Sequence, residues 1–401
     1  MRFFKIDSLH TRHIILLFLF RVFISQVVCY FIINHSVLPD TNVFHKYGIE
    51  EFDLLFSHPR EYFTNLFTPY NSKGFSRFLE NSDSFWNDLR SNIIIKMLSI
   101  MNIFSGKNLY INTLFFNFIV FFGLTALYKT FITVYKYSKK GVIFCVFILP
   151  SAIIFTSSIH RDGLILLAIS IIIYLLHFGM TEKKLSGKKI FLIAISLILI
   201  LLLRNYVFVL LIPPLLGWFL SVRKPGSTLL IFTLIYAICA FFFFISGFIS
   251  PKIDLPKYTV DRQEQFVELA DSSHSSIEVQ PLQTSLKSFL KFTPQAIDHA
   301  FLRPYLSGIA TKFFLPFAIE ILIYKLLFLL FIFFRKKEIR RSPIIYFCVF
   351  FSVSMLICIG FIVTNVGSLV RYRSLYLIFL MLPIICNIDW AKIKDIKFKN
   401  I

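Results

Sequence analysis

The chain has 401 residues, of which 57% are hydrophobic and 51 are phenylalanine, and its mean hydropathy is +0.73. Soluble domains contain roughly 45–50% apolar residues, so this composition excludes an ordinary soluble protein. The net charge of +20 would suit a nucleic-acid binder, but the basic residues are spread over short loops between apolar runs. We therefore expect an integral membrane protein with a lipid environment and no nucleic-acid partner.

Ten apolar runs, each close to the ~20 residues that cross a hydrocarbon core, predict ten membrane-spanning helices. In chain order they are 13–33, 109–135, 141–157, 163–179, 189–204, 206–222, 228–249, 313–334, 344–364 and 374–388. Arg21 interrupts the first run and no small-residue cleavage site follows it, which favours a retained signal-anchor. The sequence thus predicts an all-α, polytopic transmembrane helical bundle that forms a single integral membrane domain, 1–401.

Basic residues recur in every second loop, in phase along the whole chain. The basic loops are 136–140, 183–189, 223–224, 335–341 and 392–399. Cytoplasmic loops are enriched in Lys and Arg, so both chain ends are expected inside and the protein in a plasma membrane. Two long segments then lie outside. The first outer loop, 34–108, mixes apolar and polar residues at helical spacing, which predicts interfacial helices, and 250–312 is expected to form a second outer loop or lid.

The stretch 189–222 is expected to fold as a helical hairpin that turns at Arg204-Asn205, because a single helix would place two basic loops on opposite sides. Each arm is then about 16 residues, or ~24 Å at 1.5 Å per residue, against a hydrocarbon core of ~30 Å. The turn should therefore lie below the outer surface, in a cavity lined by protein.

Ionisable and aromatic residues gather at the outer ends of these spans, where they are functional candidates because charge at membrane depth is costly. Guanidinium groups bind phosphate oxygens in pairs, tyrosines can stack on a sugar, and a carboxylate can act as general base on a hydroxyl. The catalytic candidates are Asp40 and Asp162. The substrate-binding candidates are His45, Tyr47, His160, Arg161, Arg204, Arg303, Tyr305, Arg371, Tyr372 and Arg373.

Structural readings of the same residues stay open. Arg371 and Arg373 could anchor a helix end in lipid headgroups, and Arg161-Asp162 could cap the helix that begins nearby. Asp40 could be a turn residue. Arg21, which could snorkel inward, is assigned no chemistry, and nor are Glu320 and Lys325. The six cysteines all fall within predicted spans without metal-ligand spacing, so no metal site is predicted.

The layout resembles that of GT-C type membrane glycosyltransferases, which use a polyprenyl-phosphate-linked sugar as donor. That superfamily has an essential Asp soon after the first span with aromatics behind it, matched by Asp40 with Phe44, His45 and Tyr47. A further acidic residue commonly lies in the second outer loop, as Asp162 does. The arginines near the outer helix ends would hold the lipid phosphate.

The resemblance implies an inverting transfer in the inner (plasma) membrane of a bacterium, from the carrier to a saccharide, lipid or protein acceptor during envelope polysaccharide synthesis. Asp40 would deprotonate the acceptor hydroxyl while arginines stabilise the departing phosphate. The first loop lacks the paired Asp-Asp or Glu-Asp of many members, so the sequence implies no cofactor and gives no support to a divalent metal.

Three alternatives remain open, and the first of them is an enzyme of the same class. An O-antigen or polysaccharide polymerase or ligase would use the late outer loop and Arg303 instead of Asp40. A transporter or flippase of a lipid-linked saccharide would show inverted repeats and charges near the midplane, and neither feature is visible in the sequence. A structural subunit of an envelope assembly is a further alternative, in which the candidate residues would not converge.

Overall fold

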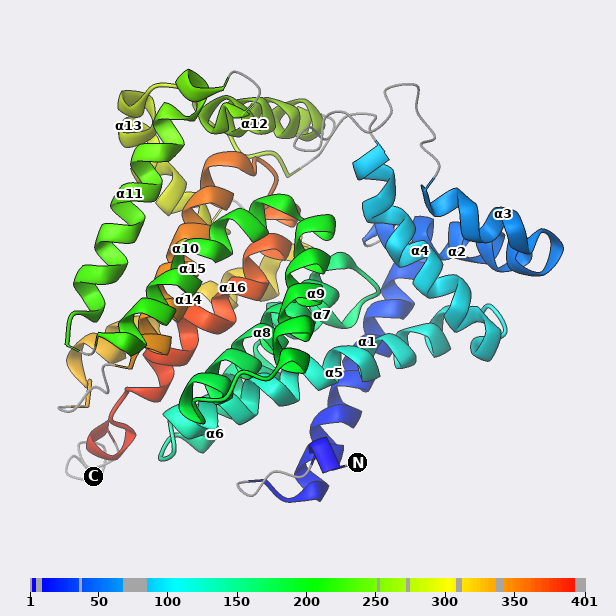
Figure 1. The fold of residues 1–401 in the computed structure, drawn as a ribbon, viewed down its shortest axis with the longest axis horizontal. Helices are drawn as coiled ribbons and strands as arrows, with labels where there is room; N and C mark the ends of the chain where they lie inside the picture. The colour runs from blue at the N-terminus through cyan, green and yellow to red at the C-terminus, as the bar shows by residue number, and fades with distance from the viewer. Residues whose placement is uncertain are drawn as a thin grey trace. The chain divides into compact units, whose positions relative to one another are not determined.

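The computed structural model describes residues 2–4, 9–35, 38–67, 85–224, 226–250, 253–271, 275–307, 312–336 and 342–393. The secondary structure of these residues is helical, apart from two isolated bridges (Figure 1). The chain divides into two compact units, each built from two segments. Unit 1 comprises Met1–Thr133 and Ile153–Phe208, and unit 2 comprises Val134–Ala152 and Val209–Ile401.

Eight of the described helices are long and apolar enough to cross a membrane. They are α1 (Thr11–His35), α5 (Leu109–Val134), α8 (Arg161–Thr181), α10 (Asn205–Arg223), α11 (Thr228–Ile249), α14 (Leu315–Phe333), α15 (Pro343–Ile362) and α16 (Val366–Cys386). The pair Lys139–Ile148 and Pro150–Ser157, bent by 41°, would make a ninth. It consists of α6 (Lys139–Ile143), η3 (Phe144–Ile148) and α7 (Pro150–Ser157). For the described residues, the prediction of an all-helical chain with many membrane-length helices is confirmed.

The stretch predicted as a hairpin forms two helices. Helix α9 (Gly187–Leu203) has 17 residues, which makes it shorter than the eight candidate spans, and α10 begins at Asn205. Arg204 stands between them in an extended conformation, with φ −151° and ψ 93°. The helix therefore breaks at Arg204, the residue at which the turn was predicted.

Helices α2 (Pro39–Ser57) and α4 (Phe85–Ser105) of unit 1 pack closely against each other (Figure 1), and the short α3 (Pro59–Thr64) and η2 (Asn65–Phe67) follow α2. The Asn102 side chain donates to the carbonyl of Gly48 at 3.0 Å, and a Cβ at Gly48 would lie 2.8 Å from Leu98 Cβ. Lys96 forms an ion pair with Glu51 across the same contact. The sequence segments 50–56 and 91–98 are thus helical, as predicted.

Polar side chains connect the long apolar helices of unit 1. Arg21 of α1 is 3% exposed, and its guanidinium donates to the carbonyl and hydroxyl of Thr156 at the end of α7. Asn117 of α5 donates to Ser25 and to the carbonyl of Ser157, each at 2.8 Å. Arg21 therefore does not snorkel to an interface, which differs from the interpretation of its sequence position, because a carbonyl group at a helix end supplies a buried partner.

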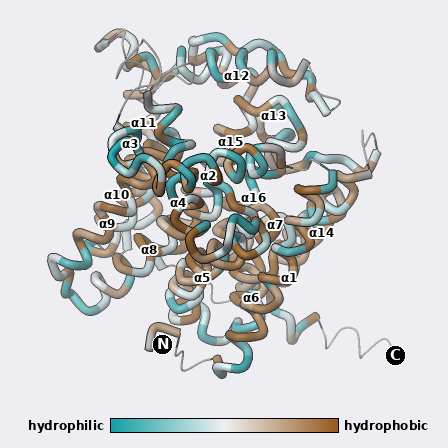
Figure 2. The backbone as a smooth tube through the Cα atoms, turned by 90° about the vertical axis from the view of Figure 1, so that its right-hand side faces the viewer, coloured by the Kyte–Doolittle hydropathy of each residue, from teal (hydrophilic) through white to brown (hydrophobic). Residues whose placement is uncertain are grey.

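Unit 2 contains the helices of the 250–312 segment, α12 (Leu255–Asp271) and α13 (Leu286–Ile297), followed by η5 (Asp298–Leu302). Figure 2 shows hydrophilic and hydrophobic residues mixed along α12. Helix α13 packs on α15 through a buried cluster that includes Phe289, Ala296 and Phe361. A Cβ at Gly360 would overlap the carbonyl oxygen of Ala296, so the absence of a side chain there permits this contact.

Helix α16 begins about two turns before the start of the predicted span 374–388. Asn365 caps it, because its side chain accepts from the Ser368 N–H at 3.2 Å and donates to Ser275 at 3.0 Å. Arg371 and Arg373 consequently lie within a helix and not in an outer turn.

Candidate functional site

Four of the predicted site residues, from three segments of unit 1, lie in one row (the Asp40–Arg204 row). Asp40 Oδ2 lies 3.3 Å from His160 Nε2, and His160 Nδ1 lies 2.8 Å from Asp162 Oδ2. The other oxygen of Asp162, Oδ1, lies 2.8 Å from Nη2 of Arg204. Carboxylates therefore flank the imidazole on both sides, and Asp162 is held between two nitrogen-containing groups.

Exposure falls sharply along the row. The Asp40 side chain is 47% exposed, whereas the side chains of His160, Asp162 and Arg204 are 4%, 0% and 7% exposed. Electrostatic interactions strengthen where water is excluded, so the buried part of the row is strongly coupled. Asp40 is the member that an external molecule can contact.

Helix ends place all four side chains. Asp40 and Asp162 lie in the first turns of α2 and α8, where the positive end of the helix dipole stabilises a carboxylate. Arg204 follows the last residue of α9, where a cation is favoured, and His160 precedes α8 in an extended conformation. Three helix termini thus supply the charges of the row.

The packing of α8 against α5 fixes the start of α8. A Cβ at Gly163 would lie 2.7 Å from the Phe116 ring and 2.9 Å from the carbonyl oxygen of Thr156. Only a residue without a side chain fits there without displacing main chain. The glycine directly after Asp162 therefore lets the first turn of α8 approach α5 and α7 closely.

Helix α2 is joined to the same segment by further contacts. The Thr41 hydroxyl donates to the carbonyl of Ile159 at 3.2 Å, and the ring centroids of Phe44 and His160 are 6.2 Å apart. Arg161 lies beside the row: its guanidinium is 5.7 Å from the Phe44 ring centroid and donates to Ser91 at 2.9 Å. These contacts hold Asp40 in register with His160.

The residue that precedes α2 has a strained backbone. Leu38 adopts φ 57° and ψ 63°, the left-handed region that branched side chains disfavour. Strain of this kind, of order 1–3 kcal/mol, concentrates at functional sites because the surrounding structure must impose it. Pro39 begins α2 directly afterwards, and Asp40 is the next residue.

His45 and Tyr47 lie further along α2. His45 is half-buried, its Nδ1 has no hydrogen-bond partner among the described residues, and burial lowers the pKa of its imidazole from 6.5. Tyr47 is exposed. Both therefore stand on the helix that carries Asp40, one to two turns beyond it.

The remaining candidates belong to unit 2 and form two small groups. Arg303 Nε lies 3.2 Å from Asp298 Oδ2, and the Tyr305 hydroxyl donates to the same carboxylate, which raises the pKa of Tyr305. Arg371 donates to the Tyr372 hydroxyl at 3.2 Å, and its guanidinium lies 4.9 Å from that ring centroid. The structure thus pairs each arginine with a tyrosine.

Arg373 is placed differently from the other arginines of the candidate set. It is 1% exposed and donates to the main-chain carbonyls of Ala300 and Arg303. Its guanidinium therefore supports the η5 segment from inside unit 2. These contacts bury the guanidinium of Arg373 against the main chain, whereas Arg303 and Arg371 are partly exposed.

Two acidic residues with clear roles in unit 2 were not selected from the sequence. Asp298 contacts both Arg303 and Tyr305, which follow it by five and seven residues. The η5 helix ends at Leu302, between Asp298 and these two residues. Glu320 of α14 is buried, and one of its oxygens accepts from the N–H and hydroxyl of Ser151, each at 3.0 Å, and from Tyr324. For Glu320, the sequence does contain a signal: a carboxylate within an apolar helix is costly and therefore a functional candidate.

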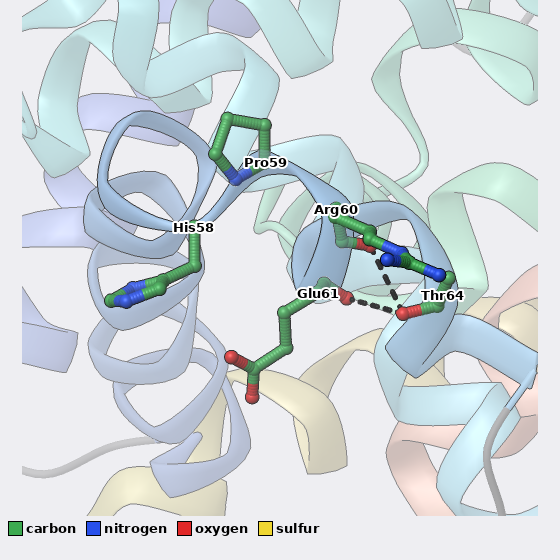
Figure 3. A pocket seen from close by; sticks show the side chains of 5 residues that line it. All are labelled: His58, Pro59, Arg60, Glu61 and Thr64. Carbon is green, nitrogen blue, oxygen red and sulfur yellow. Dashed lines mark hydrogen bonds between the residues drawn. The ribbon is translucent and has the colours of Figure 1, made fainter.

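A shallow recess at the start of α3 is a weaker candidate. Figure 3 shows its lining, which consists of His58, Pro59, Arg60, Glu61 and Thr64. All five side chains are exposed, and the Thr64 hydroxyl donates to main-chain carbonyls of the same helical turn. The recess lies at the far end of α2 from Asp40, about 27 Å along the helix at 1.5 Å per residue, so it is separate from the row.

Among the described residues, no group of three His, Cys, Asp or Glu side chains could hold a metal ion. The row itself offers two carboxylates on one imidazole, and Arg204 occupies the second oxygen of Asp162. Carboxylate and imidazole groups of this kind can accept and donate protons.

Comparisons with known proteins add no family assignment. No protein-family model matches the chain, and neither the curated proteins nor the solved structures contain a match.

Proposed function

We propose that the protein is a membrane glycosyltransferase that moves a sugar from a polyprenyl-phosphate carrier to an acceptor hydroxyl at the outer face of a bacterial plasma membrane. The observation that carries this proposal is the Asp40–Arg204 row. It presents one half-exposed carboxylate, Asp40, at the end of a buried set of charges. A general base must contact the substrate on one side and be held in place by the protein on the other, and the exposure of Asp40 beside buried partners provides both.

The proposed step transfers one proton and one glycosyl group. The acceptor O–H gives its proton to Asp40, and the acceptor oxygen forms a bond to the anomeric carbon. The bond from that carbon to the phosphate oxygen breaks, and its electron pair leaves with the phosphate. Attack from the side opposite the phosphate inverts the anomeric centre.

Within unit 2, Arg303 and Arg371 have the chemistry to bind a phosphate. Both are partly accessible, and each lies beside a tyrosine, Tyr305 or Tyr372, that can contact a sugar. Guanidinium groups bind phosphate through paired donors and stabilise the charge that develops on it as the sugar departs. Arg373 is left out of this role because carbonyl groups already occupy it.

The orientation belongs to the same proposal. The loops on one side of the predicted spans are short and basic, which favours a cytoplasmic location for them and for both chain ends. Asp40 follows α1 and His160 precedes α8, so both would then lie toward the opposite, outer side.

The direct test uses purified protein in lipid nanodiscs with a panel of radiolabelled polyprenyl-phosphate-linked hexoses and pentoses. Asp40→Asn is expected to lower transfer by about 10²–10⁴-fold, the range for loss of a general base. Asp53→Asn is the matched control, because Asp53 is an exposed carboxylate on the same helix that pairs with Lys107. Full transfer by a folded Asp40→Asn protein would rule out this mechanism.

One observation favours a transporter of a lipid-linked saccharide as the second candidate. The helix pair α6/η3 and α7 is bent by 41°, and Glu320 accepts from Ser151 just after the break. Broken helices that meet a charged group are common in secondary transporters. Proteoliposomes that carry a labelled carrier-linked sugar separate the two: movement between leaflets without product indicates transport, and product without a gradient indicates transfer.

A further inference from the structure

Helix α13 carries a line of apolar side chains that no other described segment covers (the α13 stripe). Leu286, Leu290 and Ile297 follow one another at intervals of one and two helical turns, and they are 52%, 64% and 41% exposed. The neighbouring face of the helix, with Phe289 and Ala296, is buried in the protein. A helix of only 12 residues therefore has two apolar faces, and the protein packs against one of them.

The packed face places α13 at the ends of two membrane-length helices of unit 2 (Figure 1). The ring centroid of Phe289 lies 5.5 Å from that of Phe243 and 5.3 Å from that of Phe244, within two turns of the end of α11. It also lies 5.3 Å from the ring centroid of Phe361, one residue before the end of α15. Helix α13 thus stands at the level where both helices would leave a membrane.

Two lysines border the α13 stripe. Lys287 and Lys291 are exposed, lie one turn apart and directly follow Leu286 and Leu290 in the sequence. The helix contains no acidic residue. Lys291 Nζ lies 5.1 Å from the ring centroid of Phe292, and no described carboxylate pairs with either ammonium group. The exposed side of α13 is therefore apolar along one line and positively charged along the next.

We infer that α13 is an interfacial helix that docks on the headgroup layer of anionic lipids, with the α13 stripe inserted below the phosphates and Lys287 and Lys291 beside them. Twelve residues extend about 18 Å, which is too short for a hydrocarbon core of ~30 Å. Helices with leucines on one side and lysines on the other lie in the interface plane. The two ammonium groups favour anionic over zwitterionic headgroups. Docking of this kind does not depend on the proposed sugar transfer.

Depth-dependent fluorescence quenching tests the position of the stripe. Leu290→Cys is labelled with a fluorophore in the full-length protein, whose native cysteines are buried or partly buried, and placed in nanodiscs. Ile238→Cys, at the middle of α11, is the deep reference, and Glu278→Cys, at an exposed position before α13, is the aqueous reference. The quenchers are lipids with a nitroxide near the headgroup or deep in the acyl chain, and iodide in water.

The Leu290→Cys label is expected to respond most to the shallow nitroxide, the Ile238→Cys label to the deep nitroxide and the Glu278→Cys label to iodide. Quenching of the Leu290→Cys label by iodide alone would place the stripe in water. Strongest quenching by the deep nitroxide would place α13 inside the hydrocarbon core. Protection from all three quenchers would mean that protein, such as a second copy of the chain, covers the stripe. Each of these three results would overturn the inference.

The preference for anionic lipids is measured with the same Leu290→Cys label. The shallow nitroxide is carried either on phosphatidylglycerol or on phosphatidylcholine, at equal mole fraction in one lipid mixture. Phosphatidylglycerol is expected to be enriched at the label by about two- to fivefold for each lysine at low salt, and less at high salt.

Replacement of both lysines, Lys287→Gln with Lys291→Gln, is expected to abolish this enrichment. Both side chains are exposed, so the variant should fold normally. Lys257→Gln is the matched control, because it removes an exposed lysine from α12 and should leave the enrichment in place. Equal quenching by the two lipids when both lysines are present would refute docking on anionic lipids, as would an enrichment that survives their removal.

Discussion

At the scale of single residues, Asp162 is the member of the row on which the others depend. It lies within 2.8 Å of both His160 and Arg204 and has no exposed surface. Removing one partner of a buried ion pair leaves the other charge uncompensated, which costs far more than the loss of a surface pair.

Asp162→Ala is therefore expected to destabilise the protein by about 3–5 kcal/mol, because Arg204 keeps a buried charge without its carboxylate. Thermal unfolding in detergent micelles, followed by intrinsic fluorescence, measures the change. Asp53→Ala is the matched control: its carboxylate is 58% exposed and should contribute little. Equal melting temperatures for the two variants would contradict the structural role of Asp162.

A second prediction at the scale of single residues concerns His45 and the dependence of protein stability on pH. Burial lowers the pKa of the folded imidazole below 6.5, so the unfolded chain binds a proton more readily than the folded protein. Stability should be complete above about pH 6.5 and should fall as the pH decreases toward the lowered pKa. His45→Gln is expected to remove this component.

The measurement compares melting temperatures of the wild-type protein and His45→Gln between pH 7.5 and 5. The difference should grow in favour of the variant as the pH falls. His35→Gln, which removes an exposed imidazole, is the control and should follow the wild-type protein. A constant difference between wild type and His45→Gln would mean that the buried Nδ1 has no energetic consequence.

The sequence could identify most individual members of the site but not their connections. Asp40, His160, Asp162 and Arg204 were selected because charge near the end of an apolar run is unusual. Nothing in the spacing reveals that His160 lies between two carboxylates, since one partner, Asp162, is two residues away but the other, Asp40, comes from a helix 120 residues earlier in the chain. The burial of Arg373 could not be predicted for the same reason: its carbonyl partners are contributed by another segment.

At the scale of helices, the contact of α13 with α15 gives a sharp prediction. Gly360→Ala places a methyl group against the carbonyl oxygen of Ala296, so the two helices must separate. A loss of about 1–3 kcal/mol is expected, the usual range for overpacking. Gly187→Ala on α9 is the matched control, because nothing lies within 4 Å of its added Cβ.

Thermal unfolding of both glycine variants measures this difference. Crosslinking supplies a structural readout, since a disulfide engineered across α13 and α15 should form less readily in the Gly360→Ala background. Equal stabilities would show that α13 is not held against α15 in solution.

Apolar runs in the sequence predict well where the helices lie, but they do not predict the residues at which the helices begin and end. The predicted spans coincide with described helices along the chain, because only a helix satisfies the main chain of a long apolar segment in lipid. The start of α16 was misplaced because Arg371, Tyr372 and Arg373 look like an exposed turn. Capping by Asn365 and the buried carbonyl partners of Arg373 let the helix begin earlier.

At the scale of the whole molecule, the predicted orientation can be tested with single cysteines. Tyr137→Cys lies in the loop between α5 and α6, where the native side chain is 99% exposed, and Glu50→Cys lies on an exposed position of α2. Because the basic loops are expected inside, a membrane-impermeant maleimide should label Glu50→Cys in intact cells. Tyr137→Cys should react only after permeabilisation.

The wild-type protein is the control for this labelling, since its six cysteines are buried or partly buried. Reaction of Tyr137→Cys in intact cells would reverse the orientation and place Asp40 on the cytoplasmic side. The sequence predicts this orientation only through the bias of basic residues between alternate loops, and the labelling measures it directly.

The row also constrains how the protein is made. Asp162 and His160 leave the ribosome before Arg204, which follows about 40 residues later, or roughly 2–8 s at 5–20 residues per second. During that interval the carboxylate at the start of α8 has not yet met its guanidinium. The ion pair between Asp162 and Arg204 can form only after α9 has been synthesised, so folding of this region is expected to be completed late.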